Sequence, residues 1–245
     1  FVYFARPDSM LYGQSVHQAR VRMGEALAFQ APAEADLVMG IPESGIPAAE
    51  GFARASGIPY GQGLVKNRYI GRSFIAPTQS LRAATVRMKL NPLRDNLVDQ
   101  RLVVVDDSIV RGTTTRSMIR MLREAGAAEV HLRVSSPPYR WPCFYGMDTG
   151  SRAELLAANL TVDEIQRYLE VDSLSYLSID RLLEATGATG AGFCNACLTG
   201  DYPVEIPVDL AEGMFEAMGK VKELERPGTP VSAGSGHELP TENPS

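Results

Sequence analysis

Cysteine is scarce in this 245-residue sequence: there are 3, an odd number that does not make a disulfide framework. The chain contains no run of about 18 apolar residues, so the sequence predicts no membrane span. No signal peptide opens the chain, and we therefore expect a cytoplasmic protein. The formal net charge is −5, which lacks the basic excess typical of nucleic-acid-binding proteins.

The remaining composition is that of an ordinary folded protein. Hydrophobic residues make up 44% of the chain and charged residues 22%, as in soluble globular domains. The length allows one large α/β domain with a sizeable core, or two small domains.

Strand-like and helix-like segments alternate along the first half of the chain. Short connections between such segments predict a mainly parallel sheet with right-handed crossovers and helices on its faces, an α/β fold. The periodicity predicts helices over 15–29, 46–56 and 117–125, and strands over 36–39, 102–105 and 129–134.

The part of the chain beyond Thr149 reads as helical. Ser151 with Glu154, and Thr161 with Glu164, have the spacing of two capping boxes, each opening an amphipathic helix. We expect the main domain to extend over 1–205, followed by a C-terminal helix over 206–225. Proline, glycine, serine and glutamate dominate 226–245, which predicts a disordered tail.

An acidic pair, Asp106-Asp107, follows the apolar run 102–105 and precedes a loop rich in glycine and threonine. Amides at the start of the next helix are unpaired and lie in its positive dipole field, so the loop 108–115 can bind a phosphate. The carboxylates repel a phosphate and suit ribose hydroxyls or hydrated Mg²⁺ instead. The alternative is an ordinary strand–turn–helix with an acidic turn.

A second loop, 40–45, also lies between a predicted strand and a predicted helix. Its amides can face an anion for the same reason. By itself this Pro-Glu-Ser-Gly turn is a weak signal of function. It gains weight from the acidic motif, because both loops follow strands of the same predicted sheet.

Three stretches together resemble a known family. The run VVDDSIVRGTTT resembles the 5-phosphoribosyl diphosphate (PRPP) signature of type I phosphoribosyltransferases. With FVYFARPDS at the start and FCNACLTGDYP near the end, the chain is more closely similar to the glutamine PRPP amidotransferases (amidophosphoribosyltransferases) over 1–205. The resemblance implies a type I phosphoribosyltransferase fold, with five mainly parallel strands, a small hood and C-terminal helices.

The resemblance also implies an activity. The family makes 5-phosphoribosylamine and diphosphate from PRPP and ammonia, with the ammonia derived from glutamine, in the first committed step of de novo purine synthesis. It implies that Ser44, Asp106 and Asp107 lie at the Mg²⁺. The PRPP-binding residues that it implies are Gly40, Ile41, Pro42, Glu43, Ser44, Gly45, Asp106, Asp107, Ser108, Ile109, Val110, Arg111, Gly112, Thr113, Thr114, Thr115, Arg82 and Lys89.

A basic segment after residue 65 is a candidate lid. Its cations can stabilise the charge that develops on departing diphosphate, and its closure would exclude water from the reactive carbon. The alternative is a solvated basic loop. The resemblance matches Lys66, Arg68, Arg72, Arg82 and Lys89 to the family's flexible loop and its flank. We take Lys66, Arg68 and Arg72 as candidate catalytic residues.

Cys194 and Cys197 form a CxxC pair, and Cys143 lies upstream. A CxxC alone is redox-active, metal-binding or accidental. The resemblance implies a [4Fe–4S] cluster held by four cysteines, three of which match these positions. We expect the fourth upstream of Phe1. A zinc site is the alternative and also lacks a cysteine.

The resemblance also implies partners for this chain. In the family a glutaminase domain precedes this region, and it is absent from this chain, so we expect the chain to use free ammonia. A homo-oligomer and feedback inhibition by AMP or GMP are implied in the same way. Two alternatives remain open: a nucleobase phosphoribosyltransferase, and a regulator that senses PRPP or nucleotides without catalysis.

Overall fold

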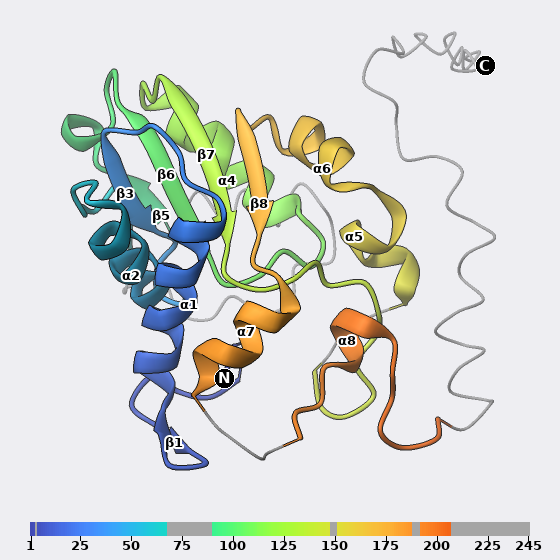
Figure 1. Cartoon of the computed structure of the whole chain (residues 1–245). Helices are drawn as coiled ribbons and strands as arrows, with labels where there is room; N and C mark the ends of the chain where they lie inside the picture. Colours follow the sequence, from blue (N-terminus) through green and yellow to red (C-terminus); the bar gives the residue numbers. More distant parts are fainter. Residues whose placement is uncertain (3, 68–89, 148–150, 188–191, 207–245) are drawn as a thin grey trace, which may run out of the picture.

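The computed structural model describes residues 1–2, 4–67, 90–147, 151–187 and 192–206 (Figure 1). A parallel four-stranded sheet forms its centre, in the order β3-β6-β7-β8. Its strands are β3 (Leu37–Gly40), β6 (Arg101–Asp106), β7 (Glu129–Val134) and β8 (Ser173–Tyr176).

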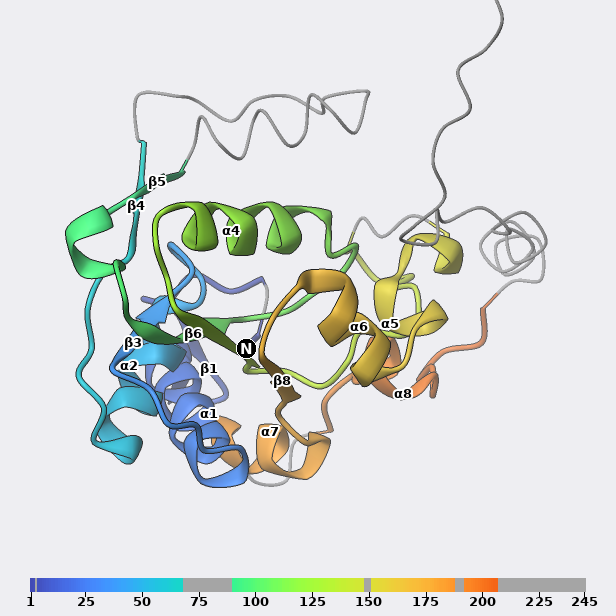
Figure 2. The same cartoon turned by 90° about the horizontal axis from the view of Figure 1, so that it is seen from above.

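Helices cover both faces of this sheet, as Figure 2 shows from above. Side chains alternate between the faces along a strand, so Val103 and Val105 of β6 pack on one side and Leu102 and Val104 on the other. The first face is covered by α1 (Val16–Gln30), α2 (Ile46–Ser56) and α7 (Ile179–Thr186), and the second by α4 (Thr113–Glu124) and α6 (Val162–Leu169).

Shorter elements surround this centre. Residues 68–89, between β4 and β5, lie outside the described residues, as do 207–245, which hold most of the expected C-terminal helix and the whole expected tail. No helix in the described residues has the length and apolar character to cross a membrane. The shorter elements are β1 (Met10–Leu11), β2 (Gln14–Ser15), β4 (Leu64–Lys66), β5 (Leu90–Pro92), α5 (Leu156–Asn159), α8 (Ala196–Thr199) and the 3₁₀ turns η1 (Arg94–Asn96) and η2 (Arg152–Glu154).

The predicted α/β class and parallel sheet are confirmed, and most element bounds are within a few residues of the prediction. The main shift is at α4, which begins at Thr113 and not at residue 117. The three threonines fill its first turn, where β-branched residues cost little because no preceding turn crowds them.

The region beyond Thr149 is not wholly helical, and that expectation was wrong. It contributes β8, in which Leu174 and Tyr176 are buried while Ser173 and Ser175 are less so. Four residues are too few for strand alternation to stand out from helical periodicity. Within the described residues the central sheet has four strands rather than five, and a single parallel bridge between Val38 and Tyr60 extends this sheet beyond β3.

One predicted capping box is present and the other is not. At the start of α6, the Thr161 amide donates to Glu164 Oε2 at 2.8 Å, and the Glu164 amide donates to Thr161 Oγ1 at 3.3 Å. The Ser151 side chain makes no capping hydrogen bond. A 3₁₀ turn follows this residue, and the Glu154 carboxylate is paired with Arg111 instead.

Thr161→Ala is expected to lower the free energy of unfolding by about 1 kcal/mol, because an N3 amide loses its acceptor. Urea denaturation followed by circular dichroism measures the change. Ser151→Ala is the matched control and should leave the free energy of unfolding unchanged. Equal losses in the two variants would contradict this assignment of the caps.

Candidate functional site

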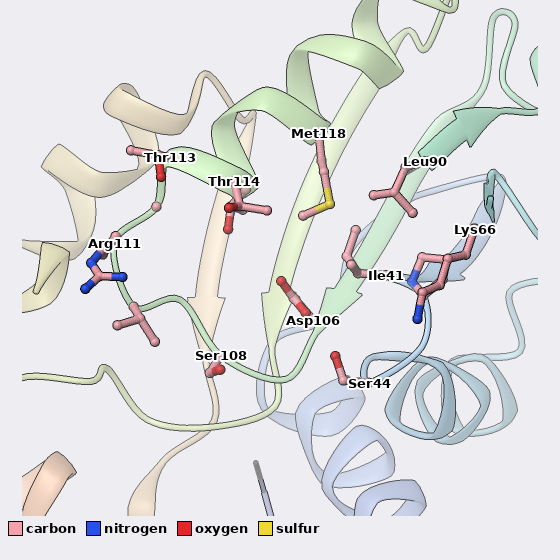
Figure 3. Close-up of a pocket in the computed structure, with 14 residues that line it drawn as sticks. Ile41, Ser44, Lys66, Leu90, Asp106, Ser108, Arg111, Thr113, Thr114 and Met118 are labelled. Carbon is pink, nitrogen blue, oxygen red and sulfur yellow. The ribbon is translucent and has the colours of Figure 1, made fainter. Parts of the chain in front are cut away.

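A pocket of about 440 Å³ opens at the carboxyl ends of β3 and β6 (Figure 3). Parallel α/β sheets bind ligands at this edge. Two strand–helix loops and the β4–β5 ribbon form its walls. The lining residues are Ile41, Pro42, Ser44, Lys66, Leu90, Asp106, Ser108, Val110, Arg111, Gly112, Thr113, Thr114, Thr115 and Met118.

The loop that leads into α4 offers a row of hydrogen-bond donors. Within the described part of the chain, the amides of 108–115 donate to no backbone or side-chain acceptor. Gly112 allows the tight turn, since its φ is +74° and a Cβ there would lie 2.5 Å from Leu156 Cδ2. These donors sit at the positive end of α4 and suit a phosphate.

The loop that leads into α2 is pressed against the end of β6. The Ile41 amide donates to the Val105 carbonyl at 2.8 Å, and the Gly45 amide donates to the Ile41 carbonyl at 2.9 Å. A Cβ on Gly45 would lie 2.3 Å from the Val105 carbonyl oxygen, so only glycine permits this approach. The amides of Glu43 and Ser44 have no acceptor in the described residues and can bind a second anion.

The acidic pair lies between these two loops. Asp106 is 6% exposed, and its Oδ1 accepts the Asp107 amide at 2.9 Å. Burial, and then the charge of Asp107, raise the pKa of Asp106 well above its usual value. Asp107 is less buried and accepts a hydrogen bond from the Ser108 hydroxyl at 2.8 Å. A cation or a set of hydroxyl donors placed here would relieve the cost of the buried charge.

Two cations of the pocket wall are already paired. Lys66 Nζ lies 3.4 Å from Glu43 Oε2, and Arg111 Nε donates to Glu154 Oε2 at 2.6 Å. The other four cations of the expected lid and its flank, which lie outside the described residues, are Arg68, Arg72, Arg82 and Lys89.

The structure brings together most of the residues that the sequence indicated, and it adds two. Leu90 enters through its pairing with β4, which sequence periodicity does not reveal. Met118 lies four residues after Thr114 on the same face of α4, so helical spacing could have found it. The predicted residues that do not line the pocket are Gly40, Glu43, Gly45, Asp107 and the core residue Ile109.

The three cysteines lie on two neighbouring segments. The Arg140 and Trp141 amides both donate to the Cys197 carbonyl at 3.0 Å, which places the Cys143 segment beside α8. Burial, and then the Cys197 and Cys143 thiols, raise the pKa of Tyr202 to about 12. Within the residues that the structure describes, no group of three or more His, Cys, Asp and Glu side chains is arranged to hold a metal ion.

Comparison with known proteins connects this geometry to one family. Residues 16–136 match the phosphoribosyl transferase domain. An amidophosphoribosyltransferase of Synechocystis is 58% identical over 206 residues, 84% of this chain and 42% of the relative. A second, from Methanothermobacter thermautotrophicus, is 52% identical over 218 residues, 89% of this chain and 46% of the relative.

A solved structure agrees with these matches. The glutamine PRPP amidotransferase of B. subtilis, complexed with ADP and GMP, superposes with a TM-score of 0.78 at 51% identity, over 85% of this chain and 47% of that one. The fold is therefore the type I phosphoribosyltransferase fold, as the family resemblance implied. The chain spans less than half the length of these relatives.

Asp106→Asn is expected to stabilise the ligand-free chain at neutral pH. In the unfolded chain this carboxyl ionises at about pH 4, whereas in the folded chain its pKa is raised, so its ionised form destabilises the fold above that pH. Asparagine removes that cost and keeps an acceptor for the Asp107 amide. The gain should shrink as the pH falls and vanish below about pH 4.

Urea denaturation across this pH range measures the gain. Asp163→Asn, at an exposed carboxylate on α6, is the control and should show no comparable change. A lower stability of Asp106→Asn at neutral pH would contradict the raised pKa.

Proposed function

The chain belongs to the phosphoribosyl transferase family, in the form that amidophosphoribosyltransferases carry, and we propose that it transfers the 5-phosphoribosyl group of PRPP to ammonia. One observation supports this most strongly: two loops with unpaired amides flank a buried carboxylate in one pocket. PRPP has the matching layout, with a phosphate at one end of a ribose and a diphosphate at the other.

Each part of PRPP has a complementary set of groups in the pocket. The amides of 108–115, with the hydroxyls of Thr113 and Thr114, suit the 5-phosphate (Figure 3). The amides of Glu43 and Ser44 suit the diphosphate. Asp106 and Asp107 then lie at the ribose between them, where carboxylates accept hydrogen bonds from hydroxyls.

Mg²⁺ fits the same position. A carboxylate buried beside a second carboxylate, with a serine hydroxyl across the pocket, offers the hard oxygen ligands that Mg²⁺ prefers, and substrate oxygens and water complete its shell. Asp106, Asp107 and Ser44 would hold it. When bound, it would neutralise charge on the diphosphate as this group leaves.

The reaction then needs no nucleophile from the protein. The ammonia nitrogen forms a bond to ribose C1 while the bond from C1 to the diphosphate oxygen breaks, and the electron pair leaves with diphosphate. The chain orients the two reactants and stabilises the departing charge. Lys66, freed from Glu43, would supply positive charge at that end, together with the lid cations Arg68, Arg72, Arg82 and Lys89.

The source of the ammonia is part of the same proposal. We propose that a glutaminase domain supplies the ammonia in the longer protein, and that this chain alone uses free ammonia. The B. subtilis neighbour was solved with ADP and GMP. We propose that purine nucleotides compete with PRPP here, because a nucleoside 5′-phosphate presents the same phosphate to the loop 108–115. We also propose that the chain forms a homo-oligomer.

We also propose a [4Fe–4S] cluster on Cys143, Cys194 and Cys197. In the described residues these three thiols are not arranged as a metal-binding group, and three thiols do not complete the ligand set of such a cluster, so the proposal requires a fourth cysteine from a longer chain. The ring of Phe1 packs against Phe193, the sequence neighbour of Cys194, with ring centroids 5.8 Å apart, so residues that precede Phe1 would begin near that segment. The role of the cluster would be structural, because glycosyl transfer moves no electrons through it.

Incubation of the chain with PRPP, Mg²⁺ and ammonium at alkaline pH should release diphosphate only when ammonium is present. Asp106→Asn combined with Asp107→Asn should reduce the rate by about 100-fold or more, because the ribose and the metal lose their ligands. Asp163→Asn, the exposed carboxylate on α6, should retain full activity.

Other outcomes would overturn the proposal in distinct ways. Release that requires a purine or pyrimidine base would identify a nucleobase phosphoribosyltransferase. Tight PRPP binding without any release would identify a sensor. Glutamine-dependent release by this chain alone would contradict the proposed need for a separate ammonia source.

Anaerobic reconstitution with iron and sulfide is expected to load about four irons per chain, weakly held because one thiolate is missing. Cys143→Ser, Cys194→Ser and Cys197→Ser should each reduce the load, measured as iron and acid-labile sulfide. Stoichiometric zinc binding, or iron binding that survives all three substitutions, would count against the cluster.

A further inference from the structure

The tip of the phosphate-binding loop is held by a segment more than forty residues further along the chain. Arg111 Nε donates to Glu154 Oε2 at 2.6 Å, and the Leu156 amide donates to the Val110 carbonyl at 2.8 Å. The Leu156 side chain packs over Gly112 so closely that a Cβ there would lie 2.5 Å from Leu156 Cδ2. One ion pair, one backbone bond and one packing contact therefore fix three consecutive loop residues.

The bracing segment, 152–156, is itself well anchored. Asn159 Nδ2 donates to the carbonyls of Ala153 at 3.0 Å and Leu155 at 2.8 Å, and Leu155 is 1% exposed. The Arg152 guanidinium lies over the Trp141 ring, 3.9 Å from its centroid. The segment can therefore hold the loop in a fixed position.

The Arg111 side chain is turned toward this brace. Figure 3 shows its guanidinium at the outer edge of the pocket, on the side away from Asp106, while Thr114 lies on the inner side. The side chains of Arg111 and Glu154 are 44% and 48% exposed, and an ion pair in such a position adds little to global stability. Its effect is local: it sets where the loop amides point.

We propose that Glu154 is a positioning residue for PRPP, which acts through Arg111 to hold the amides of 108–115 toward the 5-phosphate. The inference rests on the proposed function. In this arrangement Arg111 anchors the loop, and the amides and threonine hydroxyls bind the phosphate. The 5-phosphate takes no part in bond breaking, so loss of the brace weakens substrate binding and leaves the chemical step unchanged.

A double-mutant cycle tests this role. Arg111→Ala and Glu154→Ala should each weaken binding of ribose 5-phosphate and raise the KM for PRPP by about fivefold, with kcat within about twofold of the unaltered chain. The double variant should also lose about fivefold, because both changes release one anchor. Glu184→Ala, at an exposed glutamate on α7, is the matched control and should change neither constant.

A guanidinium that bound the phosphate directly would give a different pattern. Arg111→Ala would then cost far more than Glu154→Ala, and removal of Glu154 would tighten binding by freeing Arg111. Either of these results overturns the proposal. If Glu154→Ala lowers the melting temperature substantially, Glu154→Gln, which keeps the size and one acceptor, should restore folding and part of the affinity.

The ribose 5-phosphate arm separates this proposal from the proposed function. If the unaltered chain binds ribose 5-phosphate and the cycle is non-additive, the anchoring role stands even where PRPP is not turned over, and only the proposed function fails. A chain that does not bind ribose 5-phosphate contradicts both.

Discussion

The burial of the Asp106 carboxylate at the end of β6 is the constraint on which the site depends. A charge in that position is costly unless it meets a cation, donors or a proton, and in the ligand-free chain the raised pKa expresses that cost. Strand β6 lies between β3 and β7 with apolar cores on both faces, so Asp106 cannot move out to solvent. The core around β6 stabilises the fold enough to keep an unfavourable group in the pocket.

The two loops on either side of Asp106 contain the complementary groups, which are backbone donors without acceptors. The amides of Glu43 and Ser44 and those of 108–115 lack acceptors in the described residues, so they are available to an anion. Such loops collapse onto other acceptors unless something holds them open. Gly45 holds the first against the Val105 carbonyl, and the segment from Glu154 to Leu156 holds the second. Preorganisation of this kind lowers the ordering cost of binding a highly charged substrate.

Much of this site could be predicted from the sequence because its signals are local. The acidic pair follows a run of buried residues, and each glycine-containing loop lies between a strand and a helix, so neighbouring residues alone indicate an anion site. Leu90 was not predicted as a pocket residue, because only strand pairing with β4 brings it to the pocket. Glu154 was read as part of a capping box, because sequence spacing cannot show that Arg111 competes for its carboxylate.

By itself the sequence determined the α/β class, the two candidate anion-binding loops, the acidic pair between them and the family resemblance. These follow from period-2 and period-3.6 patterns and from short motifs, which act over a few residues. Only the tertiary structure decided which strands neighbour one another, that β8 completes the sheet, and that residues 152–156 brace the loop after β6. These contacts join residues 28 or more positions apart, and their free energy comes from packing and pairing that no local pattern encodes.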